Sequence, residues 1–101
     1  KADRIKALRL LGRSVAISQR VPHFEVAHVA AFIGFTRNGT ADPSNAFPTI
    51  KALIDGMTDA GVWPDDDSTH VIGPIYLRDP KSPTPGHYTV RLVLTSQEVP
   101  W

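Results

Sequence analysis

The spacing of apolar residues switches between a helical and a strand-like period along this chain of 101 residues. Apolar side chains recur every three or four residues in 3–20 and in 46–60, which predicts two amphipathic helices. Alternating or β-branched runs in 24–36, 70–77 and 87–95 predict three short strands. The order α-β-α-β-β predicts an α+β domain in which two helices pack on a small mixed sheet.

Turn and capping residues mark where these elements end. Pro22 stops the first helix, because proline cannot donate the backbone hydrogen bond that a helix interior needs. In the second helix, Asn45 is a candidate N-cap, Pro48 falls in the first turn, and Gly61 is a candidate C-cap. Pro74 interrupts the second strand, so we expect this strand at an edge of the sheet or with a bulge.

Each element has one side that we expect to face a shared core. The expected helical stripes are Ile5, Leu8, Leu11, Gly12 and Val15 in the first helix and Ile50, Leu53, Ile54 and Met57 in the second. Alternation gives the inward faces of two strands as Val29, Ala31, Ile33 and Phe35, then Tyr88, Val90, Leu92 and Leu94. Trp63 is expected as a core or dimer-interface anchor.

Length and composition limit what this core can do. The chain is short enough to form one domain over 1–101, near the lower end of what supports its own core. Three strands make a thin sheet, so we expect an oligomer to complete the core. The absence of cysteine excludes a disulfide and suits the cytoplasm, and no apolar run is long enough to predict a membrane span.

Charge is distributed unevenly, although the net charge is only +1. Residues 1–41 contain seven basic and two acidic side chains, whereas residues 42–67 contain six aspartates and one lysine. A basic half next to an acidic half is the arrangement that a metal-dependent enzyme acting on a polyphosphate needs. Basic side chains would hold the phosphate backbone and carboxylates would hold the metal.

The aspartates fall into clusters around Lys51. Asp42 precedes the second predicted helix, and Asp65, Asp66 and Asp67 follow it. Crowded carboxylates predict a divalent cation, and the alternative is a solvated charged surface. A helix of about 15 residues spans roughly 22 Å, so the clusters can meet only if the loop at 61–64 returns the chain, or if the sheet or a partner subunit brings them together.

Three blocks of sequence resemble a known nuclease family. Asp-Pro-Ser-Asn at 42–45, Lys-Ala-Leu-Ile-Asp-Gly-Met at 51–57 and Gly-Val-Trp-Pro-Asp-Asp-Asp at 61–67 are similar to the core of RusA-type Holliday-junction resolvases. The resemblance covers roughly residues 26 to 95. It implies a homodimeric, magnesium-dependent endonuclease, with Mn²⁺ as a possible substitute, that cuts four-way DNA junctions in recombination and repair. It also implies a cytoplasmic protein encoded by a bacterium or a phage.

The resemblance assigns roles to individual residues. Asp42 matches the first motif carboxylate, Asn45 the motif asparagine and Lys51 the motif lysine, while Asp66 with Asp65 matches the later acidic pair. Carboxylates would hold Mg²⁺ at the scissile phosphate, and the lysine would offset the charge that develops on phosphate oxygens. The predicted catalytic residues are therefore Asp42, Lys51 and Asp66, and the predicted metal ligands are Asp42, Asp65, Asp66 and Asp67.

Two departures from the family pattern leave an alternative open. Ser44 stands where the family has its second aspartate, so Asp65 or Asp67 would have to replace a carboxylate. Lys51 lies six residues after Asn45 instead of three, a shift of about one helical turn. The alternatives are a catalytically impaired DNA-binding member of the same fold and a non-enzymatic module whose acidic loop binds a basic protein.

Other residues also carry two interpretations. Lys6, Arg9, Arg13 and Arg37 are candidate DNA contacts, although a basic helix face is more often solvated. Lys51 and Asp55, four residues apart, form either an ordinary surface ion pair or part of the site. Asp59 is expected at the solvated surface. His70 is a candidate metal ligand or base. The alternative, which is the more common case, is a surface histidine at the end of a strand.

Overall fold

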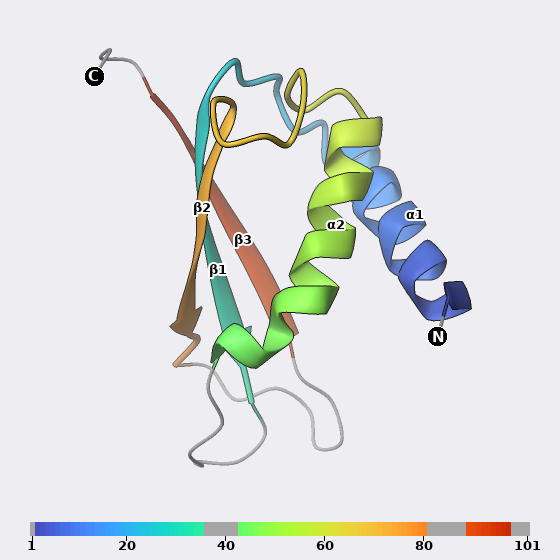
Figure 1. Ribbon diagram of the computed structural model, residues 1–101, viewed down its shortest axis with the longest axis vertical. Helices are drawn as coiled ribbons and strands as arrows, with labels where there is room; N and C mark the ends of the chain where they lie inside the picture. Colours follow the sequence, from blue (N-terminus) through green and yellow to red (C-terminus); the bar gives the residue numbers. More distant parts are fainter. Residues whose placement is uncertain (1, 36–42, 81–88, 98–101) are drawn as a thin grey trace.

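The computed structural model describes residues 2–35, 43–80 and 89–97, so Asp42 and Arg37 lie outside the described residues. The order of elements confirms the predicted α+β class, with two helices and a three-stranded mixed sheet (Figure 1). The elements are α1 (Ala2–Ser18), β1 (Ala27–Gly34), the short 3-10 helix η1 (Pro43–Ala46), α2 (Phe47–Asp59), β2 (Val71–Arg78) and β3 (Thr89–Ser96).

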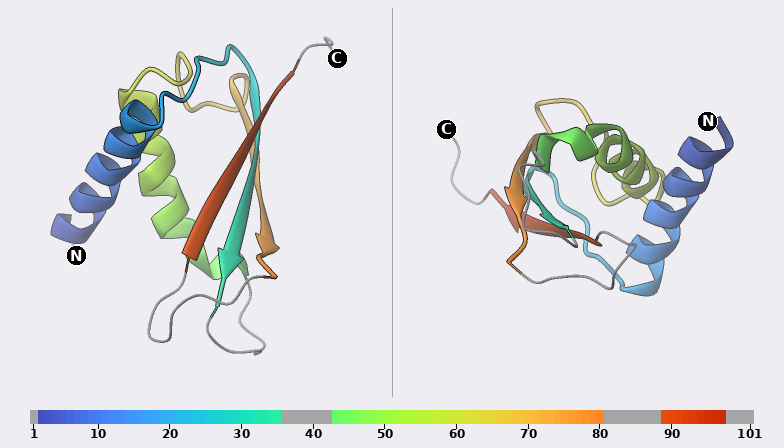
Figure 2. Two further views of the ribbon diagram at one scale, coloured as in Figure 1. Left: turned by 180° about the vertical axis from the view of Figure 1, so that it is seen from behind. Right: turned by 90° about the horizontal axis from the view of Figure 1, so that it is seen from below.

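The sheet has β1 at its centre, in the order β2-β1-β3. β1 runs parallel to β2 and antiparallel to β3. α2 connects the two parallel strands and, like α1, lies on one side of the sheet, as Figure 2 shows. Because β1 and β2 are parallel, η1 and the start of α2 lie toward the end of the sheet where both strands finish (Figure 1).

The predictions for the strand that contains Pro74 are both confirmed. β2 is an edge strand, and its register with β1 shifts from His28↔Ile72 to Ala30↔Ile75. This shift places one additional residue on β2 around Pro74, which is where a proline without a backbone N–H is tolerated.

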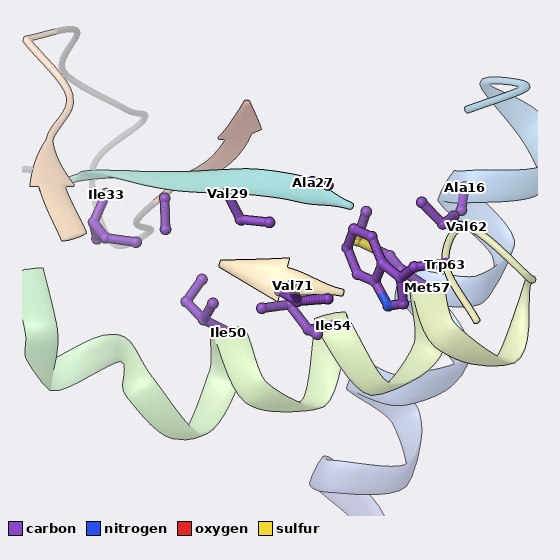
Figure 3. Packing of buried hydrophobic residues seen from close by; sticks show 11 residues of the cluster. Ala16, Ala27, Val29, Ile33, Ile50, Ile54, Met57, Val62, Trp63 and Val71 are labelled. Atoms are coloured by element: carbon purple, nitrogen blue, oxygen red, sulfur yellow. The ribbon is translucent and has the colours of Figure 1, made fainter. Parts of the chain in front are cut away.

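The core lies between α2 and the inward face of the sheet (Figure 3). Ala27, Val29, Ala31 and Ile33 of β1 alternate inward and are almost completely buried, as the strand period predicts. From α2 and the loop after it, the buried side chains include Ile50, Ile54, Met57, Val62 and Trp63. Trp63 therefore has the core position expected of it.

The expected core stripe of α1 is only partly correct. α1 packs on α2, where Gly12 allows such close contact that an added Cβ would lie 2.4 Å from the Leu53 carbonyl oxygen. Gly56 plays the matching role on α2, because a Cβ there would lie 1.9 Å from the Arg9 carbonyl oxygen. On α1, only the narrow face around Gly12 is covered. The expected core residues Ile5, Leu11 and Val15 are 45%, 51% and 39% exposed.

The N-terminus of α2 differs from the prediction, whereas its C-terminus agrees with it. The N-cap is Ala46, without a side-chain cap bond, because η1 precedes the helix and Asn45 lies within η1. At the C-terminus, Gly61 adopts a left-handed backbone with φ of 81°, and Val62 N–H donates to the Met57 carbonyl. This is a Schellman motif, in which glycine avoids the strain that a Cβ would cause.

No helix in the described part of the chain is long and apolar enough to cross a membrane.

Candidate functional site

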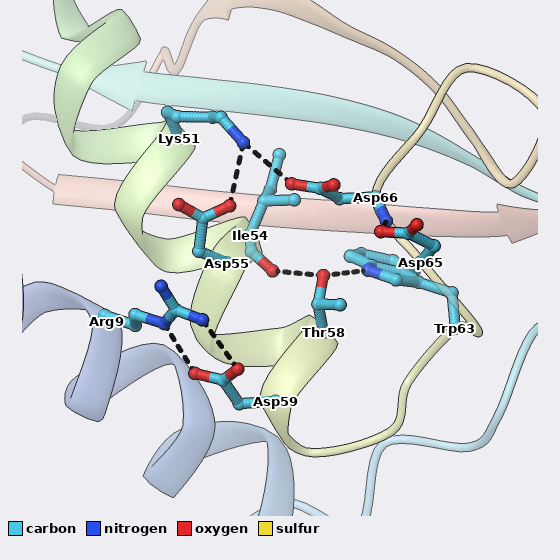
Figure 4. Close-up of polar contacts among 9 residues, drawn as sticks. All are labelled: Arg9, Lys51, Ile54, Asp55, Thr58, Asp59, Trp63, Asp65 and Asp66. Atoms are coloured by element: carbon cyan, nitrogen blue, oxygen red, sulfur yellow. Dashed lines mark hydrogen bonds and ion pairs between the residues drawn. The ribbon is translucent and has the colours of Figure 1, made fainter.

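A lysine lies between two aspartates on the outer surface of α2 (Figure 4). Lys51 Nζ donates to Asp55 Oδ1 at 2.8 Å and to Asp66 Oδ2 at 2.7 Å. Asp55 is one helical turn from Lys51, whereas Asp66 comes from the loop after α2. The two carboxylates are largely covered, with side-chain exposures of 26% and 27%, and Lys51 is half exposed. We call Lys51, Asp55 and Asp66 the lysine-aspartate cluster.

The loop after α2 makes this cluster possible because it folds back along the helix. Gly61 turns the chain, and the buried Trp63 then fixes it against α2. Trp63 Nε1 donates to Thr58 Oγ1 at 2.7 Å, and Thr58 Oγ1 donates to the Ile54 carbonyl at 3.0 Å (Figure 4). The return of the chain at 61–64, one of the alternatives drawn from the sequence, is therefore what brings Asp66 to Lys51.

The backbone next to Asp66 is also held in place. Asp66 N–H donates to Asp65 Oδ1 at 2.7 Å, so the Asp65 carboxylate stabilises the turn from which Asp66 reaches Lys51. Asp67 has a separate task, since its Oδ1 accepts a hydrogen bond from the Thr69 backbone N–H at 3.0 Å. The three consecutive aspartates thus do different things, and only Asp66 contacts the lysine.

Attraction between Lys51 and Asp66 favours the charged forms of these two side chains. The hydrogen bond from Lys51 lowers the pKa of Asp66 below its ordinary value. The hydrogen bonds to Asp55 and Asp66 raise the pKa of Lys51. Lys51 is therefore an ammonium at neutral pH, which suits a donor to anionic oxygens and excludes a role as a general base.

The described residues hold fewer candidate ligands together than the sequence predicts. Ser44 and Asn45 are exposed in η1, directly before α2, and Asp42 lies outside the described residues. Within the described ranges, no group of three or more His, Asp or Glu side chains is placed to hold a metal. His70 Nδ1 lies 2.9 Å from the Glu25 carbonyl oxygen.

The candidate DNA contacts on α1 divide into two kinds. Arg9 forms a two-pronged ion pair with Asp59, with Nε to Oδ2 at 2.6 Å and Nη2 to Oδ1 at 2.8 Å (Figure 4). Asp59 is exposed, as expected, and the contact of α1 with α2 also brings a guanidinium to it. The hydrogen bond from Arg9 lowers the pKa of Asp59. Lys6 and Arg13 are exposed, and no ion pair joins them to any described residue.

One buried carboxylate was not singled out from the sequence. Asp79 directly follows β2, and its side chain is only 8% exposed. Arg91 Nε donates to Asp79 Oδ2 at 3.4 Å, and the Arg91 guanidinium stacks 4.3 Å from the centre of the Phe32 ring. An aspartate at the end of a strand is too common to indicate this pairing in advance. The contact ties β2 to β3 across the end of the sheet.

Comparison with protein-family models, with characterised proteins and with solved structures found no match to this chain. In the described part of the chain, the fold and the site define an α+β domain whose lysine-aspartate cluster lies on α2, the helix that connects the two parallel strands, and on the loop after it.

Proposed function

We propose that this protein is a magnesium-dependent endonuclease that cuts branched DNA by phosphodiester hydrolysis. The observation that carries the proposal is the meeting of Lys51 and Asp66, which are 15 residues apart in the chain. Both residues belong to the blocks that resemble RusA-type resolvases, and both have roles in that resemblance. Their contact supports a shared site formed by the two blocks.

The chemistry of the cluster fits a hard divalent cation. Asp55 and Asp66 each place a carboxylate oxygen within 2.8 Å of the same nitrogen atom, so one small cation can bind both. Mg²⁺ commonly uses only one or two protein carboxylates and completes its shell with water and substrate phosphate. When bound, Mg²⁺ would polarise the scissile phosphate and lower the pKa of a bound water. Asp42, just before η1, is the further ligand that the resemblance implies.

Lys51 supplies a positive charge that can change partners. In the described structure its ammonium occupies the place between the two carboxylates. A cation that takes over these carboxylates releases Lys51, which is half exposed and can then donate to a phosphate oxygen. An ammonium that gains a phosphate partner in the transition state stabilises the charge that develops there.

The basic face of α1 lies close to the cluster and suits the DNA backbone. Arg9 and Arg13 both attract Asp59, the residue one turn after Asp55 on α2. Lys6 and Arg13 are exposed on the same helix. Phosphate contacts from such side chains provide affinity without sequence preference, which suits an enzyme that recognises the shape of its DNA.

A second candidate function is junction binding without cleavage. The observation that favours it is that Lys51 already satisfies both carboxylates, while Ser44 stands where the family has an aspartate. In this case the ion pairs would stabilise the loop at 61–70 and no cation would enter.

Metal titration separates the two functions. We expect calorimetry with Mg²⁺ and Mn²⁺, in the presence of a synthetic four-way junction that carries uncleavable linkages, to show binding to the wild type. Asp66→Asn should weaken this binding at least tenfold. Asp67→Asn should leave it nearly unchanged, because the Asp67 carboxylate, a candidate ligand in the sequence, accepts a hydrogen bond from Thr69 and lies outside the cluster. Absence of binding by either metal to the wild type would eliminate the nuclease proposal.

A further inference from the structure

An apolar groove runs between α1 and β3. It encloses about 550 Å³ and is lined by Leu8, Leu11 and Val15 from α1, by Leu53 and Met57 from α2, and by Val90, Leu92 and Leu94 from β3. Of these α1 residues, Leu11 and Val15 are 51% and 39% exposed. A second pocket of about 440 Å³, which shares Leu8 and Thr49 with the first, extends the groove toward Arg4 and Phe35.

The strand beside this groove has a free edge. Among the described strands, β3 pairs with β1 alone, so the opposite side of β3 presents backbone N–H and C=O groups to a further strand. In both views of Figure 2, β3 is the strand nearest α1 at the end of the sheet where β3 begins. A strand added to β3 would therefore lie in the groove, with its inward side chains against α1 and α2.

The charged residues of the groove indicate where its occupant carries a charge and of which sign. Within the described part of the chain, the charged residues that line the two pockets are Arg4 and Arg91. Arg91 is paired with Asp79, whereas no ion pair joins Arg4 to a described residue. α1 and β3 both start at the lower end of the molecule in Figure 1, so Arg4 lies toward the end at which β3 begins. A strand antiparallel to β3 would have its C-terminal end there.

We infer that the groove binds an extended segment of another polypeptide, antiparallel to β3, with apolar side chains at alternate positions and an acidic residue at its C-terminal end. The backbone of this segment pairs with the free edge of β3. Its alternate side chains fill the space between α1 and the sheet. The side-chain carboxylate of its last residue pairs with Arg4. This function is separate from the lysine-aspartate cluster and does not depend on nuclease activity.

The test uses two fluorescein-labelled peptides that differ only at the last residue. The first is Thr-Val-Thr-Leu-Thr-Val-Thr-Asp with an amidated C-terminus, and the second ends in Lys. Fluorescence anisotropy at low ionic strength, at concentrations where each peptide alone is monomeric, should show two- to fivefold tighter binding of the Asp peptide, the range for an exposed ion pair. Arg4→Glu should reverse this preference.

Two neighbouring leucines of α1, one in the groove and one outside it, provide a matched pair of variants. Leu11→Asp, at a groove residue that is 51% exposed, should weaken binding of the Asp peptide by about tenfold or more, because it places a charge against apolar side chains. Leu10→Asp, at a residue that is 63% exposed and does not line the groove, should have little effect. Circular dichroism establishes that both variants are folded.

NMR shows where the peptide binds. Amide signals of 90–94 in β3 should shift and exchange more slowly when the peptide is added, whereas those of β2 should not. Shifts confined to β2 or to the open face of the sheet, or equal losses in Leu10→Asp and Leu11→Asp, would overturn the inference. So would a wild-type dimer in light scattering that Leu11→Asp alone dissociates, since a second copy would then be the occupant.

Discussion

Lys51 Nζ lies 2.7 Å from Asp66 Oδ2, although Lys51 is in the first half of α2 and Asp66 is in the loop that follows the C-terminus of this helix. The contact depends on the reversal at Gly61 and on the burial of Trp63. A surface loop that only needed to be soluble would gain little from such an anchor. The position of Asp66 is therefore determined by the core, and the cluster is a defined arrangement with consequences that can be measured.

The first prediction concerns the charge of Lys51. Asp66→Asn removes one of the two carboxylates that stabilise the ammonium, so the pKa of Lys51 should fall toward its ordinary value while Asp55 holds it partly raised. NMR titration of the Lys51 side chain measures this. Asp67→Asn serves as the control, because Asp67 is bonded to Thr69 and not to Lys51. An unchanged pKa of Lys51 in Asp66→Asn would show that the contact does not persist in solution.

The second prediction concerns stability at low pH. The folded protein lowers the pKa of Asp66 from 3.8, so this residue contributes stability above that pH, and the contribution disappears as the pH falls through the lowered value. At pH 7 the wild type should exceed Asp66→Asn in free energy of unfolding by about 1 kcal/mol or less. The difference should stay constant down to about pH 5 and shrink below pH 4. Urea unfolding at several pH values tests this, and a difference that grows with acidity would contradict it.

The third prediction concerns the contact between the helices. Gly56→Ala places a Cβ against the backbone of α1, where it would lie 1.9 Å from the Arg9 carbonyl oxygen. Alanine favours a helix by about 1 kcal/mol over glycine, but the separation of α1 from α2 should outweigh this gain. We expect a net loss of about 1–3 kcal/mol in the free energy of unfolding, the range for overpacking. Urea unfolding followed by circular dichroism measures it, and a variant as stable as the wild type would refute the close contact.

The fourth prediction concerns DNA binding by α1. Asp59→Asn removes the carboxylate that engages Arg9, so it should free a guanidinium and strengthen binding to a labelled four-way junction. Arg13→Gln should weaken binding and reduce the slope of log affinity against log salt concentration by about 0.9. Fluorescence anisotropy over a range of salt concentrations gives both results. If Asp59→Asn and Arg13→Gln change the affinity in the same direction, α1 is not the surface that contacts DNA.

Local patterns in the sequence determine much of the fold. The alternation in β1 predicts its buried face, Gly61 predicts the end of α2, and Pro74 predicts an edge strand with a bulge. Each of these results follows from steric or hydrogen-bonding rules that act within a few residues. Prediction succeeded where such a rule decides the structure alone.

Contacts between distant residues could not be predicted in this way. Periodicity shows that α1 has an apolar side, but not that close packing at Gly12 and Gly56 would leave much of that side open. The pairing of Arg9 with Asp59 joins residues 50 positions apart and depends on how two helices meet. The contact of Lys51 with Asp66 could not be predicted for the same reason, since the loop after α2 could have returned along the helix or extended away from it.

Cleavage of a synthetic four-way DNA junction tests the proposed function most directly. The account predicts paired nicks that require Mg²⁺ or Mn²⁺, a loss of at least a hundredfold in rate for Lys51→Met and for Asp66→Asn, and nearly normal cleavage by Asp67→Asn at equal junction binding. Ser44→Asp, which restores the family's second carboxylate, should raise the rate. Tight junction binding by the wild type with no nicking in either metal would contradict the nuclease proposal and leave junction binding as the function.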